Sequence, residues 1–364
     1  MDSGNTPPGG RDDGPANGEE RRQYTPVQQM QEQPRRRRRW PWVVGGIAVL
    51  LLILGAGAIA AIVALTANST TAGAAPTTFD EEYVSGDGSN KIAVVPVEGT
   101  IASADNTTGG VQSTVTPEGL EAALDQAASD GAIKGIVLEV NSPGGGVTAS
   151  DQMHESIEDF KKATGKPVVV SMGDTAASGG YYISTAADEI VANETTLTGS
   201  LGVIITLTNF SEAADKYGIK QEVIKSGEFK DIGSSFREMT PEEREIYQSI
   251  VDEQYSEFVN VIVQGRDLPE DRVREIADGR VYSGEQAKAL GLVDKFGDLE
   301  VAAGDARERA GVSDATVVRY ILPETFSDVL LARLEPQEPE AVQIMKATGL
   351  YPTPQLQYLY RPGL

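Results

Sequence analysis

Ser178 is the serine whose surroundings are best suited to chemistry, because two glycines follow it at the end of an apolar run. The run 167–172 (PVVVSM) predicts a buried strand, and helix signals begin at Gly179. A serine at such a boundary can expose its Oγ while the free N–H groups of the helix start point toward a substrate. Serine is also a frequent helix N-cap. The local sequence leaves a nucleophile and a cap as equal alternatives.

A glycine run at 141–146 (NSPGGG) follows the apolar stretch 135–140 (GIVLEV). In open α/β sheets, ligands bind beyond the carboxyl ends of the strands, so this loop and the loop at Ser178 are expected beside one cleft. The run lacks the Lys-Ser or Lys-Thr pair of a phosphate-binding loop. A plain tight turn is the alternative, since glycine is the default turn residue.

A serine nucleophile needs a base to take its proton. His154 is the only imidazole of the chain, and its acidic helical surroundings predict a solvated position. A lysine base would need its pKa to fall from about 10.4 toward 7–8 through desolvation or a neighbouring cation. The residues alone leave both kinds of base open.

The elements around these loops alternate between apolar runs and amphipathic segments. This pattern predicts an α/β body with a mostly parallel sheet flanked by helices. Strands are predicted at 91–97, 135–140, 167–172, 189–192, 203–207, 221–225 and 316–322. Helices are predicted at 117–129, 150–163, 179–187, 240–264, 268–277 and 283–290, the fourth with Thr240 as N-cap and Pro241 at its first position.

The N-terminal part predicts a membrane anchor. Residues 1–41 are rich in Arg and Pro and are expected to be disordered, whereas 42–65 contain no charged residue. As a helix, 42–65 would extend roughly 36 Å, enough for a hydrocarbon core of about 30 Å. That length favours an uncleaved signal anchor over a cleaved signal peptide. The arginines at 35–39 predict a cytoplasmic N-terminus and an extracytoplasmic body.

The anchor is followed by a predicted polar linker at 66–90, a folded domain at 91–322 and a partly disordered C-terminal extension at 323–364. The net charge of −23 argues against binding to nucleic acid. The chain has no Cys and a single His, which excludes thiolate nucleophiles, Cys-ligated metals and multi-His metal sites.

Five segments together resemble signal peptide peptidase A, a family of membrane peptidases that use a serine and a lysine. They are 141–145 (NSPGG), 175–182 (TAASGGYY), 198–204 (TGSLGVI), 225–234 (KSGEFKDIGS) and 276–287 (IADGRVYSGEQA). The resemblance covers roughly 91–301, in order and at the family's spacing, and corresponds to the family's short, single-unit form.

By position, the resemblance implies roles for five residues. Ser178 matches the nucleophile, and Lys230, which lies 52 residues later, matches the general base. Ser200 matches the serine that orients that lysine. The backbone N–H groups of Gly145 and Gly179 match the oxyanion hole, where fixed donors stabilise the tetrahedral intermediate.

Asp231 follows the implied base directly. A carboxylate that pointed toward Lys230 would raise the pKa of the lysine, so we expect the side chain of Asp231 to turn elsewhere.

The resemblance further implies a crotonase-like fold, as in the Clp protease subunit, and assembly into a homo-oligomeric ring or dome. In the short form, serine and lysine come from neighbouring subunits. The expected substrates are signal peptides left in the membrane after secretion, and the enzyme's own C-terminal tail can be trimmed. The resemblance also implies that the reaction needs no metal and no cofactor. Three alternatives stay open, namely a stomatin-associated Ser/Lys peptidase acting on membrane proteins, an acyl-CoA-handling crotonase homologue, and a catalytically silent membrane scaffold.

Overall fold

The computed structural model describes residues 78–103, 114–322 and 356–359. Contacts divide the chain into two units, 1–65 and 66–364, and every described residue belongs to the second. The predicted tail at 1–41 and anchor at 42–65 lie outside the described residues. Within the described ranges, none of the helices combines the length and the apolar character that a membrane span requires.

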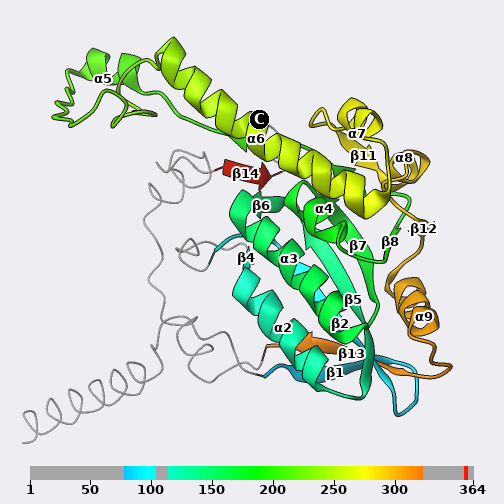
Figure 1. Cartoon of the computed structure of the whole chain (residues 1–364). Helices are drawn as coiled ribbons and strands as arrows, with labels where there is room; N and C mark the ends of the chain where they lie inside the picture. The colour runs from blue at the N-terminus through cyan, green and yellow to red at the C-terminus, as the bar shows by residue number, and fades with distance from the viewer. Residues whose placement is uncertain (1–77, 104–113, 323–355, 360–364) are drawn as a thin grey trace, which may run out of the picture. The chain divides into compact units, whose positions relative to one another are not determined.

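The main sheet is mostly parallel, as predicted (Figure 1). Only two pairs of its strands, β1 with β13 and β11 with β9, run antiparallel among the described residues. The strand path is β1 (Asp80–Ser85), β13 (Thr316–Ile321), β2 (Lys91–Glu98), β5 (Ile133–Ser142), β7 (Val168–Ala177), β8 (Glu189–Ala192) and β12 (Lys295–Phe296). The strand β9 (Leu197–Gly199) pairs with β7 and with β11 (Val281–Ser283).

Helices cover both faces of this sheet. The alternation of side chains along a strand divides β2 between two cores, Ala93 and Val95 in the larger and Ile92 and Val94 in the smaller. The larger core includes buried residues of α2 (Pro117–Ser129), α3 (Val147–Thr164), α4 (Gly179–Ser184) and α6 (Pro241–Arg266). The smaller is closed by alanines of α9 (Leu299–Arg309). Two short helices, α7 (Glu270–Ile276) and α8 (Gly284–Ala289), complete the fold.

A second, smaller sheet lies beyond the carboxyl end of β5. Its order is β10 (Ile204–Ile205), β14 (Leu356–Leu359), β6 (Gly144–Gly146), β3 (Thr100–Ile101) and β4 (Thr114–Val115). β6 follows β5 after one residue and pairs with β3 on one side and β14 on the other. The chain thus brings a glycine strand to the edge where parallel strands end.

Residues 206–247 form an extended part that we call the arm. It contains α5 (Ser211–Tyr217), the irregular segment 218–240 and the first turns of α6, and it projects from the body along α6 (Figure 1). At the start of α6, Thr240 is the N-cap and Pro241 the first helical residue, as predicted. Thr240 and Glu243 also form a capping box, which was not predicted.

Two predicted features are wrong. The strand predicted at 221–225 is absent, and these residues are exposed and irregular within the arm. The linker predicted at 66–90 extends too far, because β1 occupies Asp80–Ser85 and pairs with β13. All six residues of β1 (DEEYVS) are exposed, so the strand shows no alternation of apolar residues that would reveal it.

Candidate active site

Ser178 lies between the end of β7 and the first residue of α4, as the sequence predicts. Its backbone has φ 54° and ψ −116°, a conformation that non-glycine residues seldom adopt. Such strain persists only where surrounding contacts hold it, and it is frequent at functional sites. The N–H of Ser178 donates to the carbonyl oxygen of Gly199 at 2.8 Å, which ties the strained residue to β9.

The side chain of Ser178 does not cap α4. The residue is 1 % exposed, and its Oγ has no hydrogen-bond partner among the described residues. A buried hydroxyl without a partner carries a desolvation cost of about 1–3 kcal/mol, so it calls for a functional explanation. Ser178 therefore occupies the N-cap position of α4, but its hydroxyl does not cap the helix.

Gly145 and Gly179 approach each other closely. A Cβ atom built on Gly179 would lie 3.1 Å from the backbone nitrogen of Gly145 and 2.5 Å from Oγ of Ser150. A Cβ on Gly145 would lie 1.8 Å from the carbonyl oxygen of Ile101. Neither position has room for a side chain. Gly179 is also the first residue of α4, where N–H groups have no partner within the helix.

Ser142 holds the turn that leads into β6. Its Oγ donates to the carbonyl oxygen of Gly99 at 2.6 Å and accepts from the N–H of Gly144 at 3.1 Å. Gly144 has φ 96°, so the turn depends on glycine there. Gly144 therefore lies in a tight turn, which was one alternative for the glycine run. At Gly145 a glycine is needed because β3 lies too close for a side chain.

Ser200 lies directly after Gly199, the partner of Ser178. It has φ 52°, and its N–H donates to the carbonyl oxygen of Arg280 at 2.7 Å. The structure therefore brings Ser178, Ser200, Gly145 and Gly179 to one region, built from the ends of β5, β7 and β9.

Lys230 lies elsewhere, on the arm. The segment between α5 and α6 that contains it is separated from α4 by much of the length of α6 (Figure 1). Its N–H donates to the carbonyl oxygen of Gly227 at 3.2 Å, and its side chain is exposed. Among the described residues, no carboxylate lies within ion-pair distance of its Nζ. Within one chain, Ser178 and Lys230 are not brought together.

Asp231 turns away from Lys230, as expected. Its Oδ1 lies 2.7 Å from Nζ of Lys225 and 2.9 Å from Nη2 of Arg237. Hydrogen bonds from Arg237 and Lys225 hold the pKa of Asp231 well below its usual range. Lys225 also donates to the carbonyl oxygen of Glu228 at 2.7 Å, so its ammonium is used for structure.

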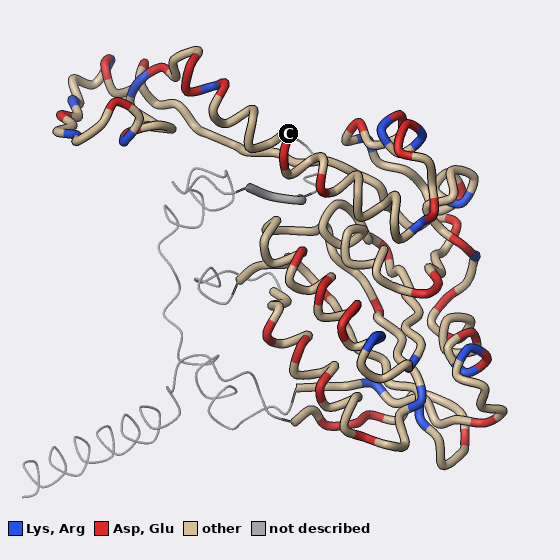
Figure 2. The backbone as a smooth tube through the Cα atoms, viewed as in Figure 1, with Lys and Arg blue, Asp and Glu red and all other residues tan. Residues whose placement is uncertain are grey.

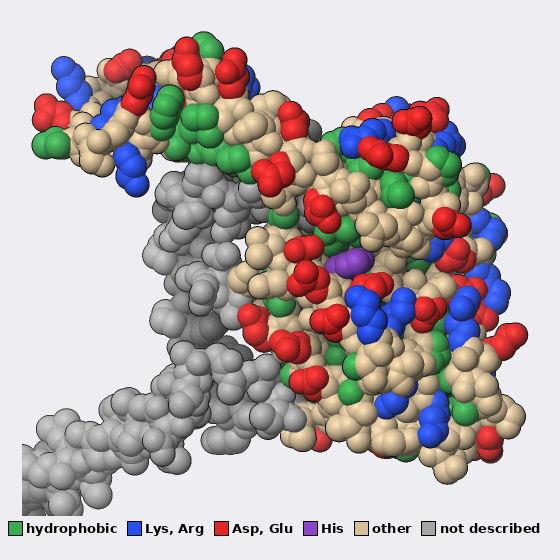
Figure 3. Space-filling model, in the orientation of Figure 1, with side chains coloured by type: hydrophobic (Ala, Val, Ile, Leu, Met, Phe, Trp, Pro, Cys, Tyr) green, Lys and Arg blue, Asp and Glu red, His purple; other side chains and the backbone are tan. Residues whose placement is uncertain are grey.

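His154 is half-buried on α3, where its ring meets the edge of Tyr182 at a centroid distance of 5.4 Å. It is the purple side chain in Figure 3. Burial lowers the pKa of His154, and the nearby carboxylates of Glu158 and Asp151 oppose that shift. The solvated position predicted for it is only partly correct.

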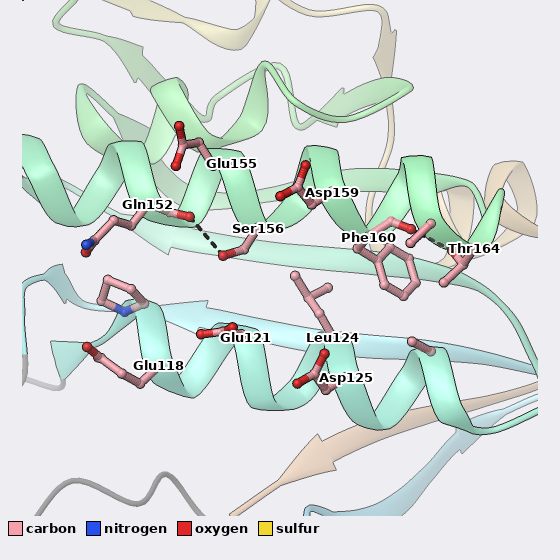
Figure 4. A pocket seen from close by; sticks show the side chains of 13 residues that line it. Glu118, Glu121, Leu124, Asp125, Gln152, Glu155, Ser156, Asp159, Phe160 and Thr164 are labelled. Carbon is pink, nitrogen blue, oxygen red and sulfur yellow. Dashed lines mark hydrogen bonds between the residues drawn. The ribbon is translucent and has the colours of Figure 1, made fainter.

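A groove between α2 and α3 is separate from the Ser178 region (Figure 4). Asp and Glu positions recur along both helices (Figure 2). The carboxylates that line the groove are those of Glu118, Glu121, Asp125, Glu155 and Asp159. The groove lining includes no Lys, Arg or His and none of the residues of the Ser178 region, so it is not the catalytic centre.

Comparison with known proteins identifies the class. Residues 160–313 match the model of Peptidase family S49. "Putative signal peptide peptidase SppA" of Enterococcus faecium is 38 % identical over 241 residues, covering 66 % of this chain and 70 % of that protein. The chain belongs to Peptidase family S49 and is a serine peptidase of the SppA type.

Two longer relatives show similar identity. "Protease 4" of Haemophilus influenzae is 35 % identical over 66 % of this chain and 38 % of its own length. "Serine protease SPPA, chloroplastic" of Arabidopsis thaliana is 33 % identical over 67 % of this chain and 36 % of its own length. The chain thus spans well under half of these two proteins.

Proposed function

We propose that this chain is a membrane-anchored endopeptidase that degrades remnant signal peptides, with Ser178 as nucleophile and Lys230 as general base. The observation that carries the proposal is the strained, buried Ser178, whose hydroxyl has no partner among the described residues and which stands beside the paired glycines Gly145 and Gly179. We also propose a crotonase-like fold, which is consistent with the glycine strand β6 at the carboxyl edge of the main sheet.

The chemistry is acyl transfer. Oγ of Ser178 attacks the scissile carbonyl carbon while its proton passes to the neutral amine of Lys230. The carbonyl oxygen gains negative charge and accepts hydrogen bonds from the N–H groups of Gly145 and Gly179. The C–N bond then breaks, and the leaving amine takes the proton from Lys230. Water hydrolyses the acyl ester by the same steps, with Lys230 again receiving and returning the proton.

The pairing of β14 supports binding of substrates as extended strands. Its backbone runs antiparallel to β6, with Tyr358 opposite Gly145, and it pairs with β10 on its other side. A peptide in the position of β14 would place its carbonyl groups along the glycine strand, and main-chain hydrogen bonds would bind it with little regard to sequence. This suits apolar segments such as signal peptides. It also makes the tail at 356–359 a candidate for trimming by the enzyme itself.

We propose that Lys230 acts on Ser178 of a neighbouring copy of the chain in a ring or dome. The arm that carries Lys230 exposes large apolar side chains (Figure 3), as expected for a surface covered by another subunit. They are Tyr217, Ile219, Val223, Ile224, Phe229 and Phe236, of which Tyr217 is 74 % exposed. Ser200 of the subunit that holds the nucleophile would then orient the incoming lysine.

The membrane anchor is proposed from residues 42–65, with the N-terminus in the cytoplasm and the catalytic domain outside it. Neither metal nor cofactor takes part in the proposed reaction.

The direct test is cleavage of a synthetic signal peptide by the full-length chain in detergent. We expect Ser178→Ala and Lys230→Ala to be inactive and His154→Ala to remain active. Mixing the two inactive variants under conditions that allow subunits to exchange should restore activity, because some sites then combine an intact serine with an intact lysine. An active Lys230→Ala would show that the base is misassigned. Failure to restore activity in subunits shown to exchange would refute the shared site.

A further inference from the structure

The carboxylate of Asp231 is held by two cations of the arm. Arg237 donates from Nη2 to Oδ1 at 2.9 Å and from Nε to Oδ2 at 3.1 Å, while Nζ of Lys225 donates to Oδ1 at 2.7 Å. Arg237 Nη2 also donates to the main-chain oxygen of Asp231 at 3.0 Å. The guanidinium therefore fixes both the side chain and the backbone of the residue that follows Lys230.

The same guanidinium is bound to α6. Nη1 of Arg237 donates to Oε2 of Glu243 at 2.8 Å. The side chain of Glu243 is only 3 % exposed, and its Oε2 accepts from the N–H of Thr240 in the capping box. Because the capping box fixes Glu243 on the first turn of a 26-residue helix, Arg237 ties the irregular segment around Lys230 to a rigid element.

An unmasked Asp231 would act against a neutral Lys230. A carboxylate on the neighbouring residue favours the charged form of a lysine and so raises its pKa, which opposes its use as a base. Hydrogen bonds from Arg237 and Lys225 keep the pKa of Asp231 low, so the carboxylate stays ionised at neutral pH. Protonation cannot remove its charge there, and only the two cations can offset it.

We propose that Arg237 is a positioning residue that draws Asp231 away from Lys230 and fastens the segment of the base to α6. This inference rests on the proposed role of Lys230. Its geometric basis is that all three guanidinium nitrogens are used on two carboxylates, one adjacent to the base and one on the helix.

The elements around this cluster carry other ionisable groups. The arm segment supplies Glu228, whose carbonyl oxygen holds Lys225, and Glu238, whose carboxylate accepts from Asn209 at 3.1 Å. From α6, Tyr247 lies against Gly233, and burial raises the pKa of its hydroxyl. The segment 204–210, which packs on the same loop, carries no ionisable side chain.

The test is the pH dependence of kcat/KM for signal-peptide cleavage by the full-length chain in detergent. Arg237→Gln removes the cation, and we expect the acid limb of the profile to move to higher pH by about one unit, roughly a tenfold loss of rate on that limb. Asp231→Asn in the Arg237→Gln background should move the limb back, whereas Asp231→Asn alone should move it little. Arg237→Lys keeps a cation but cannot bridge both carboxylates, so its shift should be smaller.

Arg244→Gln is the matched control, since it removes an exposed arginine from the first turns of α6, next to Glu243 and outside the cluster around Asp231. It should leave the profile unchanged. A uniform loss of rate in Arg237→Gln at every pH, not relieved by Asp231→Asn, would reduce Arg237 to a structural residue and overturn the inference. Lys230→Ala distinguishes failure of this inference from failure of the proposed function. If Lys230→Ala is active, Lys230 is not the base and the proposed function is refuted. If Lys230→Ala is inactive and the pH profile of Arg237→Gln is unshifted, only the role of Arg237 is refuted.

Discussion

The N–H of Ser178 donates a 2.8 Å hydrogen bond to the carbonyl oxygen of Gly199, so the strained residue before α4 is held by β9 and not by its own helix. Gly199 has φ 82° and is followed by Ser200 at φ 52°. Two consecutive residues with positive φ thus set the position of the carbonyl group that holds Ser178. The geometry of the serine depends on a strand that is joined to the sheet through β7 and β11.

Gly199→Ala should impair both stability and activity. A Cβ there would lie 2.6 Å from the ring of Tyr282 and 2.9 Å from the carbonyl oxygen of Arg280, in addition to the backbone strain. We expect a loss of about 2 kcal/mol or more in the free energy of unfolding and slower labelling of Ser178 by a fluorophosphonate.

Gly218→Ala is the control for strain alone, because Gly218 has φ 69° but a Cβ would meet nothing within 4 Å. It should cost about 1 kcal/mol and leave the labelling rate unchanged. Equal effects of the two substitutions on labelling would contradict the account of the Ser178–Gly199 bond.

Gly145→Ala should lower kcat by about 100-fold or more, because its Cβ would displace β6 from β3 and move an N–H proposed for the oxyanion hole. Gly146→Ala, on the next residue, should be tolerated, since the nearest atom to its Cβ would lie 3.8 Å away. The check is steady-state cleavage of a fluorogenic peptide. Similar activity in both variants would argue against a catalytic role for Gly145.

His154 should make stability fall at mildly acidic pH. Burial lowers its folded pKa below the unfolded value of about 6.5, so its neutral form stabilises the fold above that pH, and this contribution is lost as the pH falls through the folded pKa. We expect the free energy of unfolding in urea to drop between pH 7.5 and pH 5 by more in the wild type than in His154→Gln. Carboxylates titrate in both proteins, so their effect on the free energy of unfolding cancels in the comparison. An equal drop in both proteins would refute the contribution of His154.

Removal of residues 356–364 should raise the initial rate on an added peptide. β14 occupies the space between β6 and β10 where a substrate strand is proposed to bind, so the tail competes with it. The effect should appear as a lower apparent KM with kcat nearly unchanged. An unaltered KM would mean that β14 does not overlap the substrate position.

Local chemistry explains which features could be predicted. The N-cap at Thr240 followed by Pro241 and the apolar spacing of 117–129 are contained in a few neighbouring residues, and both helices begin where predicted. The strand ends predict that the two glycine loops lie beside one cleft. The pairing of β6 with Ile101, more than 40 residues away in sequence, is not revealed by any local pattern.

The strand wrongly predicted at 221–225 has an instructive cause. Val223 and Ile224 are β-branched and apolar, which favours a strand in a sequence read alone. In the structure both are exposed on the arm, Ile224 fully, so the apolar residues mark a surface and not a core. A run of β-branched, apolar residues does not by itself show whether the chain buries them.

The separation of the arm from α4 has a consequence for the newly made protein. In the proposed assembly, a lone chain carries a nucleophile without its base and is inert toward its surroundings. Activity would then rise more steeply than linearly with the density of the protein in the membrane, and dilution would keep separate chains inactive. If assembly is the activating step, as proposed, the chain would need neither a propeptide nor an inhibitor to stay latent.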